Sequence, residues 1–232
     1  MSKVSNSRDS FDLLTEEIIQ CRKCSRLVEF RERIAREKTK RFAEWQYWGK
    51  PVPGFGDREA ELVIVGLAPA PHGGNRTGRV FTGDLSARFL MRNLYEAGFA
   101  NKPDSVSADD GLELFNAYML AAVRCVPPEN KPTSQEAANC YPYFRRELLL
   151  LSKKRVILAL GRFAFDASLK FIEEMGADAS GKVFRHGAVY RFKGLPSLYA
   201  SYHPSPRNTN TGTLTGRMFL SLLKKIRNEI AR

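Results

Sequence analysis

Residues 61–84 read ELVIVGLAPAPHGGNRTGRVFTGD, an unbroken apolar run followed by a long loop of glycine, proline and polar residues. The run at 61–67 shows no alternation of polar and apolar residues, which is typical of a strand covered on both faces. Three more runs have the same character, at 116–123, 155–161 and 197–201. Helical patterns separate the four runs. Strands that alternate with helices predict an α/β fold around a mainly parallel sheet.

Four helices are predicted beside these strands. Asp84 is a good N-cap for a helix that ends at a glycine, and Ser134 can cap a helix that runs toward Lys153. Two further helical patterns cover 162–176 and 214–230. These four helices can cover both faces of the predicted sheet.

The length of 232 residues and the 43% hydrophobic content predict a single domain over 1–232. Residues 184–194 form an additional extended piece whose place we leave open. No apolar run approaches the 18 residues that a membrane helix needs. The N-terminal sequence lacks the apolar segment and cleavage site of a signal peptide, so we expect a cytoplasmic protein.

The charge is strongly positive and unevenly distributed. Lysine and arginine outnumber aspartate and glutamate by 37 to 25, a net charge of +12. Half of this excess lies between Cys21 and Lys50, where aromatic residues, including Trp45 and Trp48, interleave with the basic ones. Such a pattern indicates a surface for nucleic acid. A solvated basic helix with its aromatics packed onto the domain is the alternative.

Binding sites in parallel sheets form where the strands end. The last strand delivers SYHPSPRNTNTG, residues 201–212, in which two prolines follow His203. Phe81, in the first loop, could stack on a planar base or pack in the core. Asn116, at the start of the second strand, carries an amide that matches a base edge offering a donor and an acceptor, or that satisfies a turn. Each residue taken alone is compatible with a purely structural role.

The first loop also contains glycines spaced as in a phosphate-binding P-loop, at positions 73 and 78. Arg79 replaces the lysine of that motif, and Val80 replaces the hydroxyl that would hold magnesium. Nucleotide hydrolysis would therefore lack its cation and its charge clamp. The glycines can still let backbone amides approach an anion.

The four cysteines are Cys21, Cys24, Cys125 and Cys140. A close pair in a cytoplasmic chain favours metal binding or redox chemistry over a structural disulfide. The second pair is too widely spaced for a zinc ribbon, and ligands from two distant segments suit an iron–sulfur cubane. Zinc, or four unrelated buried thiols, are the alternatives.

Taken together, these motifs resemble the uracil-DNA glycosylase superfamily. The strings GLAPAPHGGNRTGRVFTGD and SYHPSPRNTNTG look like its two signature motifs, and the most similar branch is family 5, the B-type enzymes of bacteria and archaea. The order of the cysteines is similar to the [4Fe–4S] ligands of families 4 and 5. The resemblance implies a three-layer α/β/α sandwich with a short, mainly parallel central sheet, in which the cluster tethers an N-terminal helix. It also implies a DNA repair glycosylase that flips uracil, and other deaminated bases, out of DNA and hydrolyses the N-glycosidic bond.

The resemblance also implies a role for each matching residue. Phe81 would stack on the flipped base, and Asn116 would hydrogen-bond its O4/N3 edge. The backbone at Leu67 and Ala68 would line the O2 side. His203 would donate a hydrogen bond to uracil O2 and stabilise the departing anion. A base inside a duplex is unreachable without such extrusion.

Leu67 departs from the sister families, which carry a polar residue at this position. Because Leu67 cannot activate water, we expect Asp84 to orient the water and to offset the charge of the sugar, although Asp84 also reads as an ordinary helix cap. Asn75 and His72 are weaker substitutes for this task.

The loop after His203 is expected to reach the DNA backbone through Arg207, Asn208 and Asn210. DNA is the expected partner, and we expect a monomer. The alternative function is a non-catalytic iron–sulfur protein that binds nucleic acid without cleaving it.

Overall fold

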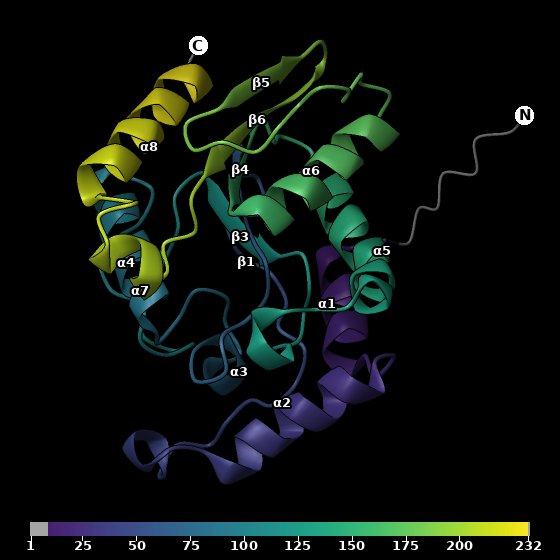
Figure 1. Ribbon diagram of the computed structural model, residues 1–232, viewed down its shortest axis with the longest axis vertical. Coiled ribbons are helices and arrows are strands. Elements are labelled where there is room, and N and C mark those ends of the chain that lie inside the picture. The colour runs from purple at the N-terminus through teal and green to yellow at the C-terminus, as the bar shows by residue number, and fades with distance from the viewer. Residues whose placement is uncertain (1–8, 232) are drawn as a thin grey trace, which may run out of the picture.

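Six strands form one sheet in the order β1-β3-β2-β4-β6-β5 in the computed structural model, which describes residues 9–231 (Figure 1). In chain order they are β1 (Phe55–Gly56), β2 (Leu62–Gly66), β3 (Ala117–Ala121), β4 (Val156–Leu160), β5 (Val189–Phe192) and β6 (Leu195–Ser201). The four inner strands run parallel, whereas β1 and β5 pair antiparallel at the two edges. The inner strands are the four predicted apolar runs. The additional extended piece predicted at 184–194 contains β5, which is the edge strand beside β6.

Helices and short turns connect the strands. The longer helices are α1 (Phe11–Gln20), α2 (Ser25–Glu37), α4 (Leu85–Glu96), α5 (Ser134–Leu150), α6 (Arg162–Glu174) and α8 (Gly216–Ile230). The shorter ones are η1 (Lys40–Phe42), α3 (Gly74–Thr77), η2 (Pro128–Asn130) and α7 (Pro206–Asn210). All four predicted helices are present. The cap of α5 is Thr133 rather than Ser134, because Thr133 and Glu136 form a reciprocal capping box.

Alternating side chains of the inner strands build two cores, one on each face of the sheet. Ile64 and Leu158 face the core that α4 and α8 close, and Val63 and Ile157 face the core that α5 and α6 close. Figure 1 shows α4 and α8 on one side of the sheet and α5 and α6 on the other. The predicted three-layer α/β/α sandwich is therefore confirmed.

Two N-terminal helices take the place of the single one that was expected. Leu14 and Ile18 of α1 pack against Tyr143 of α5. The chain then breaks at Cys21, which ends α1, and resumes helix after Cys24, which caps α2. Two of the four predicted cysteine ligands, Cys21 and Cys24, thus lie in the bend between two helices.

Residues 1–8 and 232 lie outside the described residues. The predicted single domain over 1–232 and the predicted absence of a signal peptide both concern these residues in part. Between residues 9 and 231 the structure contains no helix that is long and apolar enough to cross a membrane.

Candidate active site

The carboxyl ends of the inner strands lie in one row. Gly66 of β2 pairs with Ala121 of β3, and Leu160 of β4 pairs with Ser201 of β6. His203 comes two residues after the end of β6. The predicted site edge therefore holds the loops that follow all four parallel strands.

Phe81 and His203 meet at this edge. Phe81 adopts a left-handed backbone with φ of 48°, and its ring lies so close to Gly66 that a Cβ there would be 2.6 Å from Cζ. The ring centroids of Phe81 and His203 are 6.5 Å apart, with planes 32° from parallel. The side-chain amide of Asn208 donates to the backbone carbonyl of His203 over 2.8 Å and holds the loop. The two rings are therefore neighbours at this edge, and we call the space beside them the slot.

Burial sets the charge of His203. Loss of hydration destabilises the imidazolium and lowers the pKa of His203 from 6.5 to about 4. The ring is therefore neutral at pH 7 and carries one N–H donor and one acceptor nitrogen. Such a group can donate a hydrogen bond to a developing anion without bringing a charge into the site.

Asp84 is both a helix cap and part of a cavity. One carboxylate oxygen accepts from the backbone N–H of Ala87 over 2.9 Å, so the predicted cap of α4 is present. The other oxygen lies against Gly73, where a Cβ would approach it to 2.2 Å. Asp84 also lines a cavity of about 530 Å³ beside Arg41 and Arg88. Burial raises the pKa of Asp84, and hydrogen bonds from the Ala87 and Ser86 amides partly oppose this rise.

Arg76, in the same loop, is enclosed by aromatic rings. Its guanidinium lies 4.1 Å from the ring centroid of Phe42 and 4.0 Å from that of Trp45. It donates to the carbonyls of His72 and Gly83. Trp45 is therefore a packing partner of a protein cation, and the structural alternative for this aromatic residue holds. Nothing in the sequence signals this cage, because Arg76 lies more than 30 positions from both rings.

Arg79 excludes the P-loop interpretation. Its guanidinium pairs with the buried carboxylate of Asp110 at 2.8 Å and donates to Ser105 and Thr82. The residue at the P-loop lysine position is thus neutralised inside the protein. Gly78, with φ of 78°, allows a turn against the ring of Trp48 rather than a phosphate cradle.

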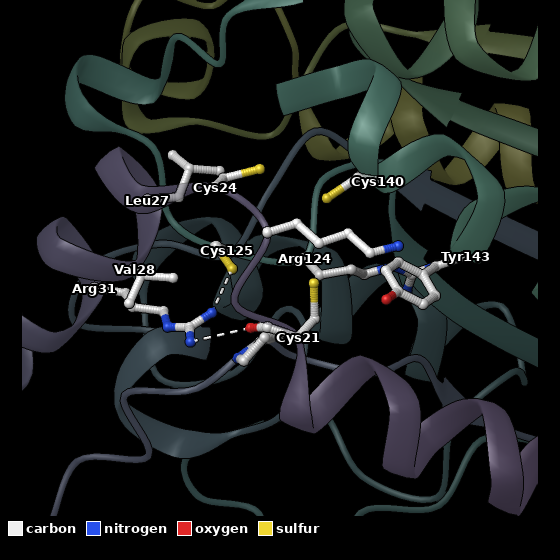
Figure 2. A pocket seen from close by; sticks show the side chains of 11 residues that line it. Cys21, Cys24, Leu27, Val28, Arg31, Arg124, Cys125, Cys140 and Tyr143 are labelled. Atoms are coloured by element: carbon white, nitrogen blue, oxygen red, sulfur yellow. Dashed lines mark hydrogen bonds between the residues drawn. The ribbon is translucent and has the colours of Figure 1, made fainter. Parts of the chain in front are cut away.

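The four cysteines line one small cavity between α2, α5 and the loop after β3 (Figure 2). In Figure 2 their sulfur atoms point toward a common space. All four are free thiols rather than disulfides. Burial raises the pKa of Cys125 to about 12 and also raises that of Cys140. Among the described residues, no three side chains of histidine, cysteine, aspartate or glutamate are placed to bind a single metal ion, whereas in a four-iron cubane each thiolate binds a different iron.

A buried arginine lies beside these thiols. Arg31 of α2 is 2% exposed, donates to the Cys125 sulfur at 2.9 Å and to the Cys21 carbonyl at 3.2 Å. The described residues offer Arg31 no carboxylate within ion-pair distance. A buried cation without a carboxylate is costly, which fits a neighbouring anion held by the cysteines. The sequence shows Arg31 only as one basic residue among many.

The comparison with known families fits this geometry. A family model described as the uracil DNA glycosylase superfamily matches residues 53–227. The chain belongs to the uracil-DNA glycosylase superfamily. It is 43% identical over 225 residues to a type-5 uracil-DNA glycosylase of Pyrobaculum aerophilum, covering 97% of this chain and 96% of the relative. It is 48% identical over 212 residues to the type-5 enzyme of Thermus thermophilus, covering 91% and 94%. The type-4 enzyme of Sulfurisphaera tokodaii is 29% identical over 202 residues, covering 85% and 75%. The resemblance to family 5 is confirmed.

Asn116 does not join the site of this uracil-DNA glycosylase family member. It precedes β3, whose first residue Ala117 pairs with Leu62, so it lies at the amino edge of the sheet. Its amide donates to the Glu61 carboxylate over 2.8 Å and accepts from the Glu61 backbone N–H over 2.7 Å. Five-residue strands separate that edge from the His203 edge by about 13 Å. The assignment of Asn116 to base recognition and catalysis is wrong.

The other residues proposed around the water and the O2 side are placed as follows. The Leu67 carbonyl accepts from the Val123 N–H over 2.9 Å, so this backbone belongs to the sheet edge. Ala68 packs near the cysteines. The amide of Asn75 donates to the Arg31 carbonyl, and His72 Nδ1 lies 3.0 Å from the Tyr47 hydroxyl. Asn75 is turned away from the slot, and Asp84 remains the better candidate for orienting water.

The loop after His203 forms α7 beside the slot. Arg207 and Asn210 are exposed there, whereas Asn208 is partly buried and braces His203. The superfamily resemblance implies that all three residues contact the DNA backbone. The geometry gives Asn208 a positioning contact instead and leaves Arg207 and Asn210 free to meet a ligand.

Proposed function

We propose that this protein excises uracil from DNA by hydrolysis of the N-glycosidic bond, with Phe81, His203 and Asp84 as its working side chains. The observation that carries the proposal is the half-buried, neutral His203 beside Phe81 at the carboxyl edge of the sheet. Membership of the superfamily and the similarity to relatives named uracil-DNA glycosylases support the same reaction class.

The reaction separates charge at the sugar. The extruded base stacks on Phe81, and the bond between N1 and C1′ breaks with its electron pair leaving on the base. The N–H of His203 donates to O2 of the uracil anion and stabilises it more than the ground state, which lowers the barrier. The Asp84 carboxylate offsets the oxocarbenium charge and orients a water molecule. Oxygen of that water bonds to C1′, and a proton passes to Asp84 or to solvent.

The residues present also fit a [4Fe–4S] cluster held by Cys21, Cys24, Cys125 and Cys140. Four free thiols line one cavity, and the buried Arg31 supplies a compensating positive charge. When bound, the cluster would link the α1–α2 bend to the loop after β3 and to α5. Hydrolysis of a glycosidic bond needs no electron transfer, so its role in this proposal is structural.

We also propose that the substrates include deaminated bases other than uracil. The second residue of the first motif is the apolar Leu67, which offers no polar group to select one base edge. With Asn116 at the far edge of the sheet, the side chains placed at the slot select the base mainly by stacking and by one hydrogen bond from His203.

A glycosylase assay tests the proposal. Oligonucleotides that each carry one uracil, hypoxanthine or thymine are incubated with excess protein and then treated with alkali, which cleaves the strand at an abasic site. We expect cleavage of the uracil strand and release of free uracil. Binding of the uracil strand without base release would overturn the proposal in favour of a non-catalytic iron–sulfur nucleic-acid-binding protein.

A further inference from the structure

A groove of about 640 Å³ runs between α4 on one side and α7 with the start of α8 on the other. Figure 1 shows these three helices gathered on one side of the sheet. Arginine side chains dominate its charge: Arg88 and Arg92 from α4 and Arg217 from α8 line it, against the single acid Glu96. Pro206 and Asn210 of the His203 loop complete the wall.

The groove continues into the cavity of Asp84. Leu85 and Arg88 line both the groove and that cavity. Leu85 is the residue after Asp84, and it is 60% exposed, so its apolar side chain is available to a ligand. The groove and the cavity therefore form one trough, which starts at the proposed catalytic carboxylate and is bordered by Arg41, Arg88 and Arg217.

Two of the arginines that line this trough lack an acid partner among the described residues. Arg92 pairs with Glu96 at 3.2 Å, but in residues 9–231 no carboxylate lies within ion-pair distance of Arg88 or Arg217. Some arginines elsewhere are neutralised: the exposed Arg191 pairs with Glu229, and the half-buried Arg146 pairs with Asp9 and Glu17. The arginines that lack an acid partner in the described chain thus include two that flank the route to Asp84.

We propose that this trough binds the DNA strand that carries the target base. Arg88 and Arg217 contact successive phosphates, and the apolar side chain of Leu85 packs on a sugar or base next to the extruded nucleotide. The inference rests on the proposed function. DNA is favoured over other polyanions because the trough lies beside Asp84, the proposed catalytic carboxylate. It assigns sequence-independent affinity to α4 and α8, in addition to the loop after His203.

The test measures affinity for an undamaged, fluorescently labelled 20-base-pair duplex as a function of salt. Each lost phosphate contact reduces the steepness of log K against log salt by about 0.9, so Arg88→Gln with Arg217→Gln should reduce it by about 1.8. Leu85→Ala should weaken binding roughly fivefold with an unchanged slope, because it removes apolar contact but no charge.

The control is Lys193→Gln with Lys170→Gln, which removes the same charge from exposed positions in the β5–β6 turn and on α6, outside α4, α7 and α8. It should leave the slope as in the wild type. An unchanged slope in the arginine pair, or an equal loss in the lysine pair, would overturn the proposal and leave the trough to another polyanion, such as an acidic protein. Undamaged DNA is bound whether or not uracil is released, so failure of the trough and failure of the glycosylase proposal are distinguishable.

Discussion

The rings of His203 and Phe81 face each other with centroids 6.5 Å apart and planes 32° from parallel. A base stacked on both rings would need about 7 Å between them, because each stacked contact takes about 3.5 Å. Phe81 is backed by Gly66, whereas His203 is held by its backbone. We therefore infer that a base stacks on Phe81 and meets His203 with its edge, which is the geometry for a hydrogen bond to the leaving group.

Removal of the His203 donor should slow chemistry and spare binding. His203→Ala should lower the single-turnover rate of uracil release about 10²–10³-fold, because the hydrogen bond strengthens as charge develops on the base. His203→Gln, which keeps an N–H donor, should lose less. DNA affinity should change little in both variants. A rate loss matched by an equal loss of affinity would give His203 a role in binding rather than in catalysis.

The pH dependence follows from the pKa values of His203 and Asp84. His203 is neutral above its folded pKa of about 4, so the single-turnover rate should show no transition near pH 6.5. It should fall at lower pH as Asp84, whose pKa is raised from 3.8 by burial, becomes protonated. Measurement of the rate from pH 4 to 8 tests this. A transition near 6.5 that His203→Gln abolishes would contradict it.

Stability should also depend on His203. The unfolded histidine titrates near 6.5 and the folded one near 4, so between these values the unfolded state binds the extra proton. Folding stability is fully present above pH 6.5 and falls as the pH drops toward 4, with about 2 kcal/mol lost at pH 5. Urea unfolding at pH 7.5 and pH 5 should show a smaller decrease for His203→Gln than for the wild type.

Parallel topology explains which parts of the site the sequence could predict. The loops after 61–67 and 197–201 were expected at one edge because parallel strands end together, and Phe81, Asp84 and His203 do lie there. The same rule, applied to Asn116 at the start of a strand, predicts the opposite edge. The wrong assignment of Asn116 to the site comes from the motif resemblance, which disagrees with this rule.

Other features depend on contacts that no local pattern encodes. The contact of Arg31 with Cys125 joins residues 94 positions apart. The cage of Arg76 needs the turn after α2 to fold over α3. The sequence shows where the glycines are, but it does not show which side chains pack against them. Gly73 leaves room for the Asp84 carboxylate, and Gly66 leaves room for the ring of Phe81.

Gly73 offers an independent test of Asp84. Gly73→Ala would place a Cβ 2.2 Å from the Asp84 carboxylate and 3.0 Å from the Thr82 carbonyl, so the carboxylate must move. We expect a rate loss similar to that of Asp84→Asn, which keeps the helix cap and should change the melting temperature little. The double variant should be hardly slower than Asp84→Asn alone, because both changes disable one group. Full activity of Asp84→Asn would reduce Asp84 to a cap.

Iron content tests the cysteine site and the role of Arg31 together. We expect brown protein with about four irons per chain, and loss of colour and stability in Cys21→Ser.

Arg31 contacts Cys125 with its side chain, and its carbonyl accepts from Asn75 in the first motif loop. A nearby positive charge stabilises added electrons, so Arg31→Gln should lower the reduction potential and speed iron loss to a chelator, and Arg31→Lys should restore part of both. Arg33→Gln, an exposed neighbour on α2, is the matched control. Stoichiometric zinc in anaerobically purified protein would contradict the iron assignment, and an unchanged potential in Arg31→Gln would show that Arg31 serves packing alone.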